Sequence, residues 1–246
     1  MDKARDSGEN GHQSSEPIAL SLVGLLRDGE GLEQFFRKHH GPLAELDLRY
    51  NGLGASDARM LTAAVSLHPL RRLTLEYNAL GDAGCKALAP VLLLPTMRQL
   101  DIGHNSVGVV GCEAMASYAA LRGCTLRRLD LCHNCVGDAG TAALCRAMRA
   151  NATLTQLNLD GNAVGDEGAL MLAGALGSLW KLSVRENLIT AAALHVLVDA
   201  AAESSCLQHL DMSYNLVFQQ AAVELVRAFR ARRRRTLLAV RSLVSA

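Results

Sequence analysis

An asparagine recurs along most of the chain at nearly constant intervals, and this repetition limits the possible folds more than any other feature. The intervals between successive copies are 27, 27, 29, 28, 25 and 28 residues. Apolar residues stand eight, five and three positions before each copy and two positions after it. A period of about 20 to 50 residues indicates a stack of similar units. The seven copies are Asn51, Asn78, Asn105, Asn134, Asn162, Asn187 and Asn215.

Each unit contains a strand, a loop and a helix. Apolar and polar residues alternate before each asparagine, as in a strand, and the second half of the unit has helical spacing, as at Leu88, Val91 and Leu92. Glycine and aspartate between the halves, as in Gly81-Asp82, indicate a turn and a helix cap. Such units bury their apolar faces by stacking, with a parallel sheet on the concave side and helices on the convex side.

This pattern resembles the leucine-rich repeat family, in its ribonuclease-inhibitor-like class, over residues 43–230. The resemblance implies an α/β fold, a right-handed horseshoe-shaped solenoid of seven repeats. In this geometry the amide of each recurring asparagine can bond to backbone groups that the turning chain leaves unpaired. We therefore predict that the asparagines form a structural ladder and have no catalytic role.

The remaining segments flank the repeats. Residues 1–16 are rich in Asp, Glu, Ser, Gly and Gln, which predicts a disordered tail. Residues 17–42 are predicted to be a helical N-terminal cap, with helices over 17–26 and 30–38. Residues 231–246 are predicted to be a basic and apolar C-terminal cap.

Cysteine usage and hydropathy bear on the compartment. The number of cysteines, 7, is odd, and the acidic N-terminus matches neither a secretory nor a transit signal. We expect an intracellular, cytoplasmic protein. The longest apolar stretches, residues 87–95 and 168–176, are shorter than the roughly 20 residues of a membrane helix, so no membrane span is expected.

Leucine-rich repeats usually bind through the concave face, where strand residues between the buried leucines point to solvent. Three of the 4 tyrosines occupy one column there, directly before the asparagine. Tyrosine is enriched at binding anchors. We predict that the aromatic residues of this column form a stripe, and that this stripe binds a partner segment that carries basic and apolar groups. The candidate residues on this face are Tyr50, Tyr77, Asp101, His104, Asp130, His133, Asp160, Arg185, Asp211 and Tyr214.

An alternative explanation of this surface stays open. Aspartate is common at this strand position in the resembled family, and the aromatic residues could merely cover the loop edge. Asp101 and Asp130 would lie on neighbouring strands about 4.8 Å apart and repel each other unless Arg72, Arg128 or a partner cation offsets them.

The segment Cys132-His133-Asn134-Cys135 suggests a metal site, with Cys124, His104 or Cys145 as further ligands. A structural zinc site usually draws on two ligand pairs, and only one such pair is present. We therefore predict no metal and no cofactor. Cys85, Cys112 and Cys145 are expected to be small buried residues of the helical halves.

The sequence contains no phosphate-binding loop, zinc-protease helix or nucleophile elbow. We therefore expect no enzymatic activity. The one activity that the resemblance suggests is activation of a small GTPase, because Ran GTPase-activating proteins contain similar repeats. Those proteins generally have more repeats and an acidic tail, and none of their functional residues could be matched to a position here.

The C-terminal end carries the strongest local charge. Residues 221–246 contain seven arginines and one glutamate, although the formal net charge of the chain is only +1. The run of arginines over residues 230–235 could serve nuclear import, or could contact RNA, an acidic membrane or an acidic protein such as a tubulin tail. It could also be the solvated end of the last helix. Its arginines are Arg230, Arg232, Arg233, Arg234 and Arg235.

The sequence as a whole favours a non-catalytic interaction module or scaffold that binds a protein partner on its concave face. The alternatives are a GTPase activator and a cytoskeletal or ciliary scaffold component. Nucleic-acid binding is not favoured at a net charge of +1. The chain is expected to be a monomer or a subunit of a larger assembly.

Overall fold

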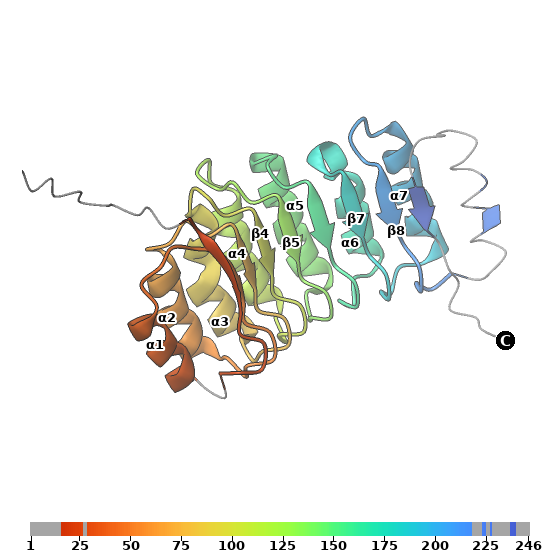
Figure 1. The fold of residues 1–246 in the computed structure, drawn as a ribbon. Coiled ribbons are helices and arrows are strands. Elements are labelled where there is room, and N and C mark those ends of the chain that lie inside the picture. Colours follow the sequence, from red (N-terminus) through yellow and green to blue (C-terminus); the bar gives the residue numbers. More distant parts are fainter. Residues whose placement is uncertain (1–15, 27–28, 218–222, 225–226, 228–236, 240–246) are drawn as a thin grey trace, which may run out of the picture.

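A computed structural model describes residues 16–26, 29–217, 223–224, 227 and 237–239. In this part of the chain, parallel strands form a single open sheet in which spatial order follows chain order (Figure 1). The strands are β1 (Ile18–Ser21), β2 (Leu43–Asp47), β3 (Arg72–Thr74), β4 (Gln99–Asp101), β5 (Arg128–Asp130), β6 (Gln156–Asn158), β7 (Lys181–Ser183), β8 (His209–Asp211) and β9 (Leu237–Ala239).

The helices lie behind the sheet in the view of Figure 1 and connect successive strands. This arrangement confirms the predicted α/β solenoid. No helix among the described residues is long and apolar enough to cross a membrane. The helices are α1 (Gly29–Lys38), α2 (Ala55–Val65), α3 (Gly81–Leu88), α4 (Val109–Ala119), α5 (Gly137–Ala150), α6 (Asp166–Ala173) and α7 (Ala191–Glu203), with the 3₁₀ helices η1 (Ala89–Leu93) and η2 (Leu176–Ser178).

The core runs the length of the solenoid between sheet and helices. Equivalent leucines of neighbouring strands pair in register, as Leu73 does with Leu100 and Leu100 with Leu129. All three are at most 2% exposed. Helix residues such as Leu88 and Leu144 close the core from the other side. Each repeat therefore buries its apolar residues against its neighbours, as repeat stacking requires.

The predicted helix over residues 17–26 is wrong, because residues 18–21 form β1 and pair in parallel with β2. Ile18, Leu20 and Leu22 alternate with small residues, and this strand period coexists with helical spacing to Leu25. Strand pairing prevails because it satisfies backbone groups on the edge of β2. The second predicted helix matches α1.

At the other end, β9 pairs in parallel with β8. Most of the segment that follows the last ladder asparagine lies outside the described residues. The predicted disordered tail, apart from Glu16, and the arginines Arg230, Arg232, Arg233, Arg234 and Arg235 also lie outside them.

The recurring asparagines bond to backbone groups between repeats. Asn105 is fully buried, and its Nδ2 donates to the carbonyl oxygens of Leu75 (2.9 Å) and Gly103 (2.7 Å). Its Oδ1 accepts the backbone N–H of Leu80 at 3.3 Å. Comparable side-chain bonds recur at the other six positions, Asn51, Asn78, Asn134, Asn162, Asn187 and Asn215. Each asparagine therefore connects two consecutive turns of the solenoid.

The aspartates of the glycine–aspartate turns cap the helix of the next repeat. From the sequence, a cap for the aspartate's own helix was the simpler expectation. Asp82 lies in the first turn of α3, and its Oδ1 accepts the N–H groups of Gly108 (2.7 Å) and Gly111 (2.9 Å) at the start of α4. Asp138 bonds in the same way to Gly165 (2.7 Å) and Gly168 (2.9 Å) of α6. These bonds couple neighbouring helices.

We expect Asp138→Ala to lower the free energy of unfolding by about 2 kcal/mol, because two N–H groups at the start of α6 lose their acceptor. Asp138→Asn keeps an acceptor oxygen and should lose less than half as much. Urea unfolding followed by circular dichroism measures both variants. Equal losses would show that the charge, rather than the acceptor geometry, provides the stabilisation.

Candidate functional site

The residue before each ladder asparagine adopts a left-handed backbone conformation. The φ angles are 59° at Tyr50, 56° at Tyr77, 51° at His104 and 51° at His133. This conformation is uncommon for residues with a side chain. The shared φ gives equivalent positions the same local geometry, so neighbouring side chains can lie parallel. The sequence pattern placed these residues in one column but contained no sign of the positive φ.

The four rings of this column stack on one another, and we call them the ring stack. The ring centroids of Tyr50 and Tyr77 lie 4.4 Å apart, those of Tyr77 and His104 3.9 Å, and those of His104 and His133 4.3 Å. The planes are inclined by 10°, 12° and 24° respectively. These distances are close to the spacing between neighbouring strands, about 4.8 Å, so the sheet itself sets the stacking distance.

A glycine ends the ring stack on each side. Gly24 precedes Tyr50 in the column and Gly161 follows His133, and both have positive φ, 62° and 61°. The ring of His133 lies where a side chain of Gly161 would begin, because a Cβ there would overlap its Nδ1 atom. Among the described residues, the ring stack is therefore limited to four members by the glycines beside it.

The ring stack is accessible to solvent. Tyr50 is 54% exposed and Tyr77 39%. His133 is exposed and His104 half-buried. Burial, followed by the neighbouring His133, lowers the pKa of His104 below 6.5. The environment therefore favours the neutral form of His104, which permits close stacking without an additional charge.

The strand residues beside the ring stack include the predicted acidic pair. Asp101 and Asp130 are partners in register on β4 and β5, and Asp130 is only 5% exposed. Arg128 Nη2 lies 3.4 Å from Asp130 Oδ2, and the Asn158 amide donates to the same oxygen at 3.1 Å. The second predicted arginine, Arg72, instead bonds with Gln99 at 2.8 Å and lies 3.5 Å from Glu45.

Asp101 forms no ion pair with the residues that the structure describes, and its environment favours the protonated acid. Burial, followed by repulsion from Asp130, raises the pKa of Asp101 to about 6. Between about pH 4 and 6 the folded protein then binds more protons at this site than the unfolded chain, so stability falls as pH rises through this range.

We expect Asp101→Asn to raise the free energy of unfolding at pH 7 by about 1 to 2 kcal/mol, after allowing for solvent screening at this partly buried site. The amide oxygen can still accept the N–H of Gly103, now bonded to Asp101 at 3.2 Å. The variant should also lose stability less steeply between pH 4 and 6. Urea unfolding across this pH range measures both effects.

Asp47→Asn is the matched control, because Asp47 lies in the same column but bonds to Arg49 at 2.7 Å. This control should not gain stability. A gain in the control equal to that of Asp101→Asn would mean that general charge reduction is responsible.

The other predicted residues form a second cluster beyond Gly161. Asp160 Oδ1 accepts bonds from Ser183 Oγ (2.6 Å) and from the backbone N–H of Arg185 (2.8 Å), and burial raises the pKa of Asp160. Arg185 Nε lies 3.9 Å from Asp211 Oδ2. The Arg185 guanidinium carbon lies 5.2 Å from the centroid of the Tyr214 ring. The predicted surface therefore consists of two parts separated by a glycine.

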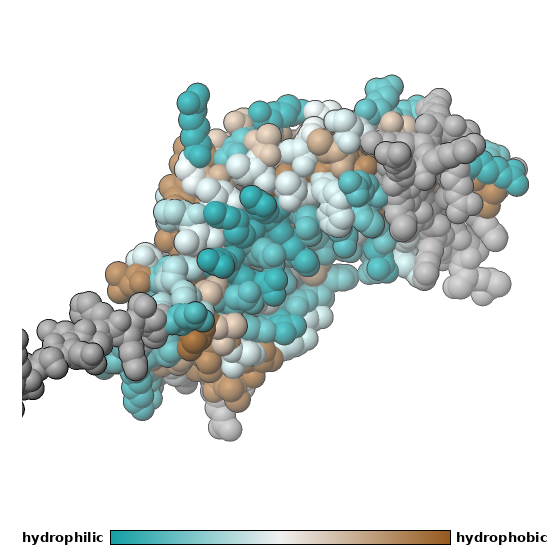
Figure 2. Space-filling model, turned by 45° about the horizontal axis from the view of Figure 1, so that its top comes forward, coloured by the Kyte–Doolittle hydropathy of each residue, from teal (hydrophilic) through white to brown (hydrophobic). Residues whose placement is uncertain are grey.

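A hollow of about 180 Å³ lies between the acidic pair and the second cluster. Figure 2 shows mainly hydrophilic residues across the middle of the face that it displays. Charged residues of both signs line the hollow, so it suits a partner with both hydrogen-bond donors and acceptors. Its charged lining residues are Arg128, Asp130, Asp160, Lys181, Arg185 and Asp211.

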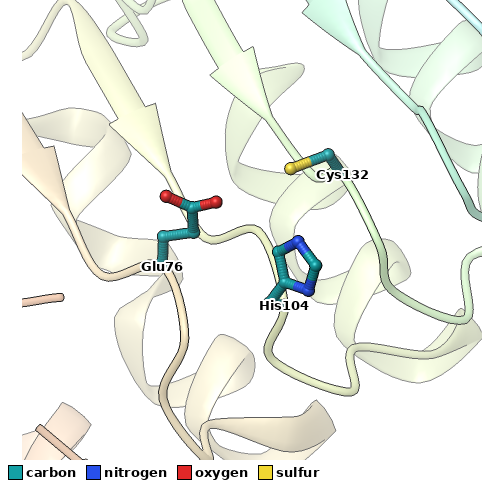
Figure 3. Close-up of side chains that lie close together, drawn as sticks. All are labelled: Glu76, His104 and Cys132. Carbon is teal, nitrogen blue, oxygen red and sulfur yellow. The ribbon is translucent and has the colours of Figure 1, made fainter. Parts of the chain in front are cut away.

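The cysteines are distributed largely as the repeat pattern predicts. Cys85, Cys112 and Cys145 are buried, Cys132 is half-buried and Cys135 is exposed. Burial, followed by Asp130, raises the pKa of the Cys132 thiol, so this thiol is a weak nucleophile. A group that the sequence analysis did not assemble is Glu76, His104 and Cys132, whose ligand atoms all lie within 4.8 Å of one another (Figure 3).

The open parallel sheet with its inter-repeat asparagine bonds defines a repeat solenoid. A family model described as leucine-rich repeat matches residues 66–89, 94–116, 124–145 and 150–173. This chain therefore contains leucine-rich repeats. A search of curated proteins finds no match.

Two solved structures match this chain at low sequence identity. A protein from Bacteroides fragilis matches with a TM-score of 0.50 and 12% sequence identity, over 86% of this chain and 59% of that chain. This chain therefore spans less than two thirds of that relative. An internalin from Listeria monocytogenes matches with a TM-score of 0.39 and 14% identity, over 88% of this chain and 70% of the internalin.

Proposed function

We propose that this chain binds a protein partner on its concave face, with the ring stack as the anchor. Leucine-rich repeats support a role as a protein-interaction module in general. The ring stack supports the more specific proposal, since it is an ordered and exposed aromatic surface on the face that is best placed to surround a partner.

The observation that carries this proposal is the parallel stacking of four rings over consecutive repeats. Each ring restricts the rotation of the next, so binding costs little additional side-chain entropy. The tyrosine hydroxyls can hydrogen-bond at the edge of the contact while the rings bury apolar area. A surface that only covered a loop edge would not require four rings to align within 24°.

The charges around the ring stack indicate the chemistry of the partner. Glu76 precedes Tyr77 in the chain, and Asp101 lies close enough to Glu76 for their carboxylates to repel each other. A lysine or arginine of the partner can contact both carboxylates and the ring of Tyr50, the tyrosine at the end of the ring stack. A partner segment that combines basic and apolar side chains fits this surface.

The proposal predicts that the double variant Tyr50→Ala, Tyr77→Ala weakens partner binding by about 30-fold or more, as expected for removal of central aromatic anchors. The partner is first captured from the native cell with the unmodified protein, and its affinity is then measured with purified components by calorimetry.

The control variant is Leu67→Ser, Val110→Ser, which removes two exposed apolar side chains, 84% and 59% exposed, away from the ring stack. Thermal unfolding establishes that both double variants are folded. An affinity of the tyrosine variant within twofold of the unmodified protein would rule out the ring stack as the anchor.

The two alternatives remain predictions. A panel of small GTPases tests for activation of GTP hydrolysis. The cytoskeletal alternative rests on Arg232 to Arg235, outside the described residues, and loss of co-sedimentation with microtubules after their neutralisation would support it.

A further inference from the structure

Three potential metal ligands from consecutive repeats meet beside the ring stack. Glu76 follows β3, His104 follows β4 and Cys132 follows β5, and all three side chains are half-buried. A carboxylate oxygen, an imidazole nitrogen and the thiol sulfur lie within 4.8 Å of one another. In Figure 3 the carboxylate and the thiol point toward each other, with the imidazole beneath the gap between them.

A glycine leaves the space in which these groups meet. Gly103 stands two residues after the end of β4, as Glu76 does after β3 and Cys132 after β5. It therefore lies between them in the stack of repeats. A Cβ at Gly103 would lie 2.6 Å from Cys132 Sγ and 3.3 Å from Glu76 Cγ. Gly103 is not among the residues with positive φ, so its backbone does not require glycine. The glycine is instead needed because the two neighbouring side chains occupy its side-chain space.

The ring stack holds His104 in a suitable orientation for coordination. The faces of its ring are covered by Tyr77 and His133, at centroid distances of 3.9 Å and 4.3 Å. Nitrogen lone pairs of an imidazole lie in the plane of the ring, so stacking leaves the edge free to bind an ion. The ligand is thus positioned before any ion arrives.

We propose that Glu76, His104 and Cys132 form a binding site for a divalent transition-metal ion, with zinc as the best match. Thiolate and imidazole ligands select zinc over magnesium or calcium, which prefer oxygen. Three protein ligands leave one tetrahedral position for water or for a group of a partner. The site differs from the zinc pattern of the sequence analysis, since Cys135 is exposed and outside the cluster.

Binding requires small movements and the loss of one proton. Ligand atoms around tetrahedral zinc lie about 3.3 to 3.8 Å apart, as follows from zinc–ligand bonds of about 2.0 to 2.3 Å. Side-chain rotation of Glu76 and Cys132 can provide this contraction. As the zinc–sulfur bond forms, the thiol of Cys132 releases its proton to the buffer. The bound ion then connects three successive repeats and stabilises the folded state.

The test uses the full chain without an affinity tag, in a reducing buffer that contains a phosphine instead of a thiol. Calorimetry with Zn²⁺ should show one ion per chain, and the heat should vary with the ionisation enthalpy of the buffer because a proton is released. Co²⁺ should produce a thiolate-to-metal absorption band in the near ultraviolet.

Variants identify the ligands. Cys132→Ser should abolish the cobalt band and weaken zinc binding by at least about tenfold, and Glu76→Gln should weaken zinc binding similarly. His104→Phe removes the ligand nitrogens but keeps an aromatic ring in the stack, and it should also weaken zinc binding. Gly103→Ala places a methyl group in the space where the ligands meet and should weaken zinc binding as well. The matched control Cys135→Ser should bind as the unmodified protein does.

The proposal is overturned if the unmodified protein takes up no zinc, if the cobalt complex has no thiolate band, or if Cys132→Ser and Cys135→Ser bind equally. Thermal unfolding without metal shows whether each variant is folded. Should Cys132→Ser fail to fold, Glu76→Gln and His104→Phe decide, and unchanged zinc affinity in both would overturn the proposal. These measurements do not depend on the partner proposed for the ring stack.

Discussion

Asn105→Ala should lower the free energy of unfolding by about 3 kcal/mol, the largest loss that we expect from a single change in this chain. The substitution removes a fully buried amide and its hydrogen bonds to the carbonyl groups of Leu75 and Gly103 and from the N–H of Leu80. The Leu75 carbonyl keeps its bond from Asn78 Nδ2. Each of these three lost hydrogen bonds costs about 1 kcal/mol. Since an ordinary domain is stable by about 5 to 15 kcal/mol, the loss is a large fraction of the total.

Chemical denaturation monitored by circular dichroism measures this loss. Asn158→Ala is the control, because Asn158 lies on the adjacent concave surface and bonds mainly to Asp130 and Asp160. The control should lose about 1 kcal/mol or less. Equal losses in the two variants would contradict a special role for the inter-repeat bonds of the ladder.

Gly161→Ala should have the second largest effect, on both stability and the geometry of the ring stack. A left-handed φ of 61° costs a residue with a side chain about 1 to 2 kcal/mol. The new Cβ also overlaps the ring of His133, which must then rotate away from its position. We expect a total loss of about 2 to 3 kcal/mol, because loss of the His104–His133 contact adds to the backbone strain.

Gly137→Ala separates the two causes. Gly137 has a φ of 58°, and a Cβ there would meet no atom within 4 Å. The control therefore contains the backbone strain without the overlap and should lose only about 1 to 2 kcal/mol. Unfolding experiments compare stability, and the imidazole NMR signals of His104 and His133 report the stack. Unchanged signals in Gly161→Ala would show that Gly161 does not limit the stack.

Much of the fold was predictable because its determinants are local. The spacing of Leu43, Leu46 and Leu48 before Asn51 identifies a strand and a turn without reference to the rest of the chain. Repetition of that spacing predicts the stacking. The helix expected at Pro17–Leu26 was wrong because its apolar residues fit two periods, and only the edge of β2 selects the strand.

The candidate site was predictable in part. Tyr50, Tyr77, His104 and His133 occupy the same position in consecutive repeats, and equivalent positions in a repeat become neighbours. The positive φ and the glycines that end the ring stack were not apparent. The group of Glu76 and Cys132 was not predicted because these residues are separated by 56 positions in the chain, whereas Cys135 is only three positions from Cys132.

The sequence by itself determined the repeating pattern from residue 43 onward, the positions of β2 to β8 and the asparagines that connect the turns, since these depend on short periodic patterns. Tertiary structure decided which aspartate caps which helix, how far the rings stack and which ligands meet over Gly103. These features depend on the stagger and side-chain space between neighbouring repeats. Stacking of one repeat on the next supplies that information, which no single repeat contains.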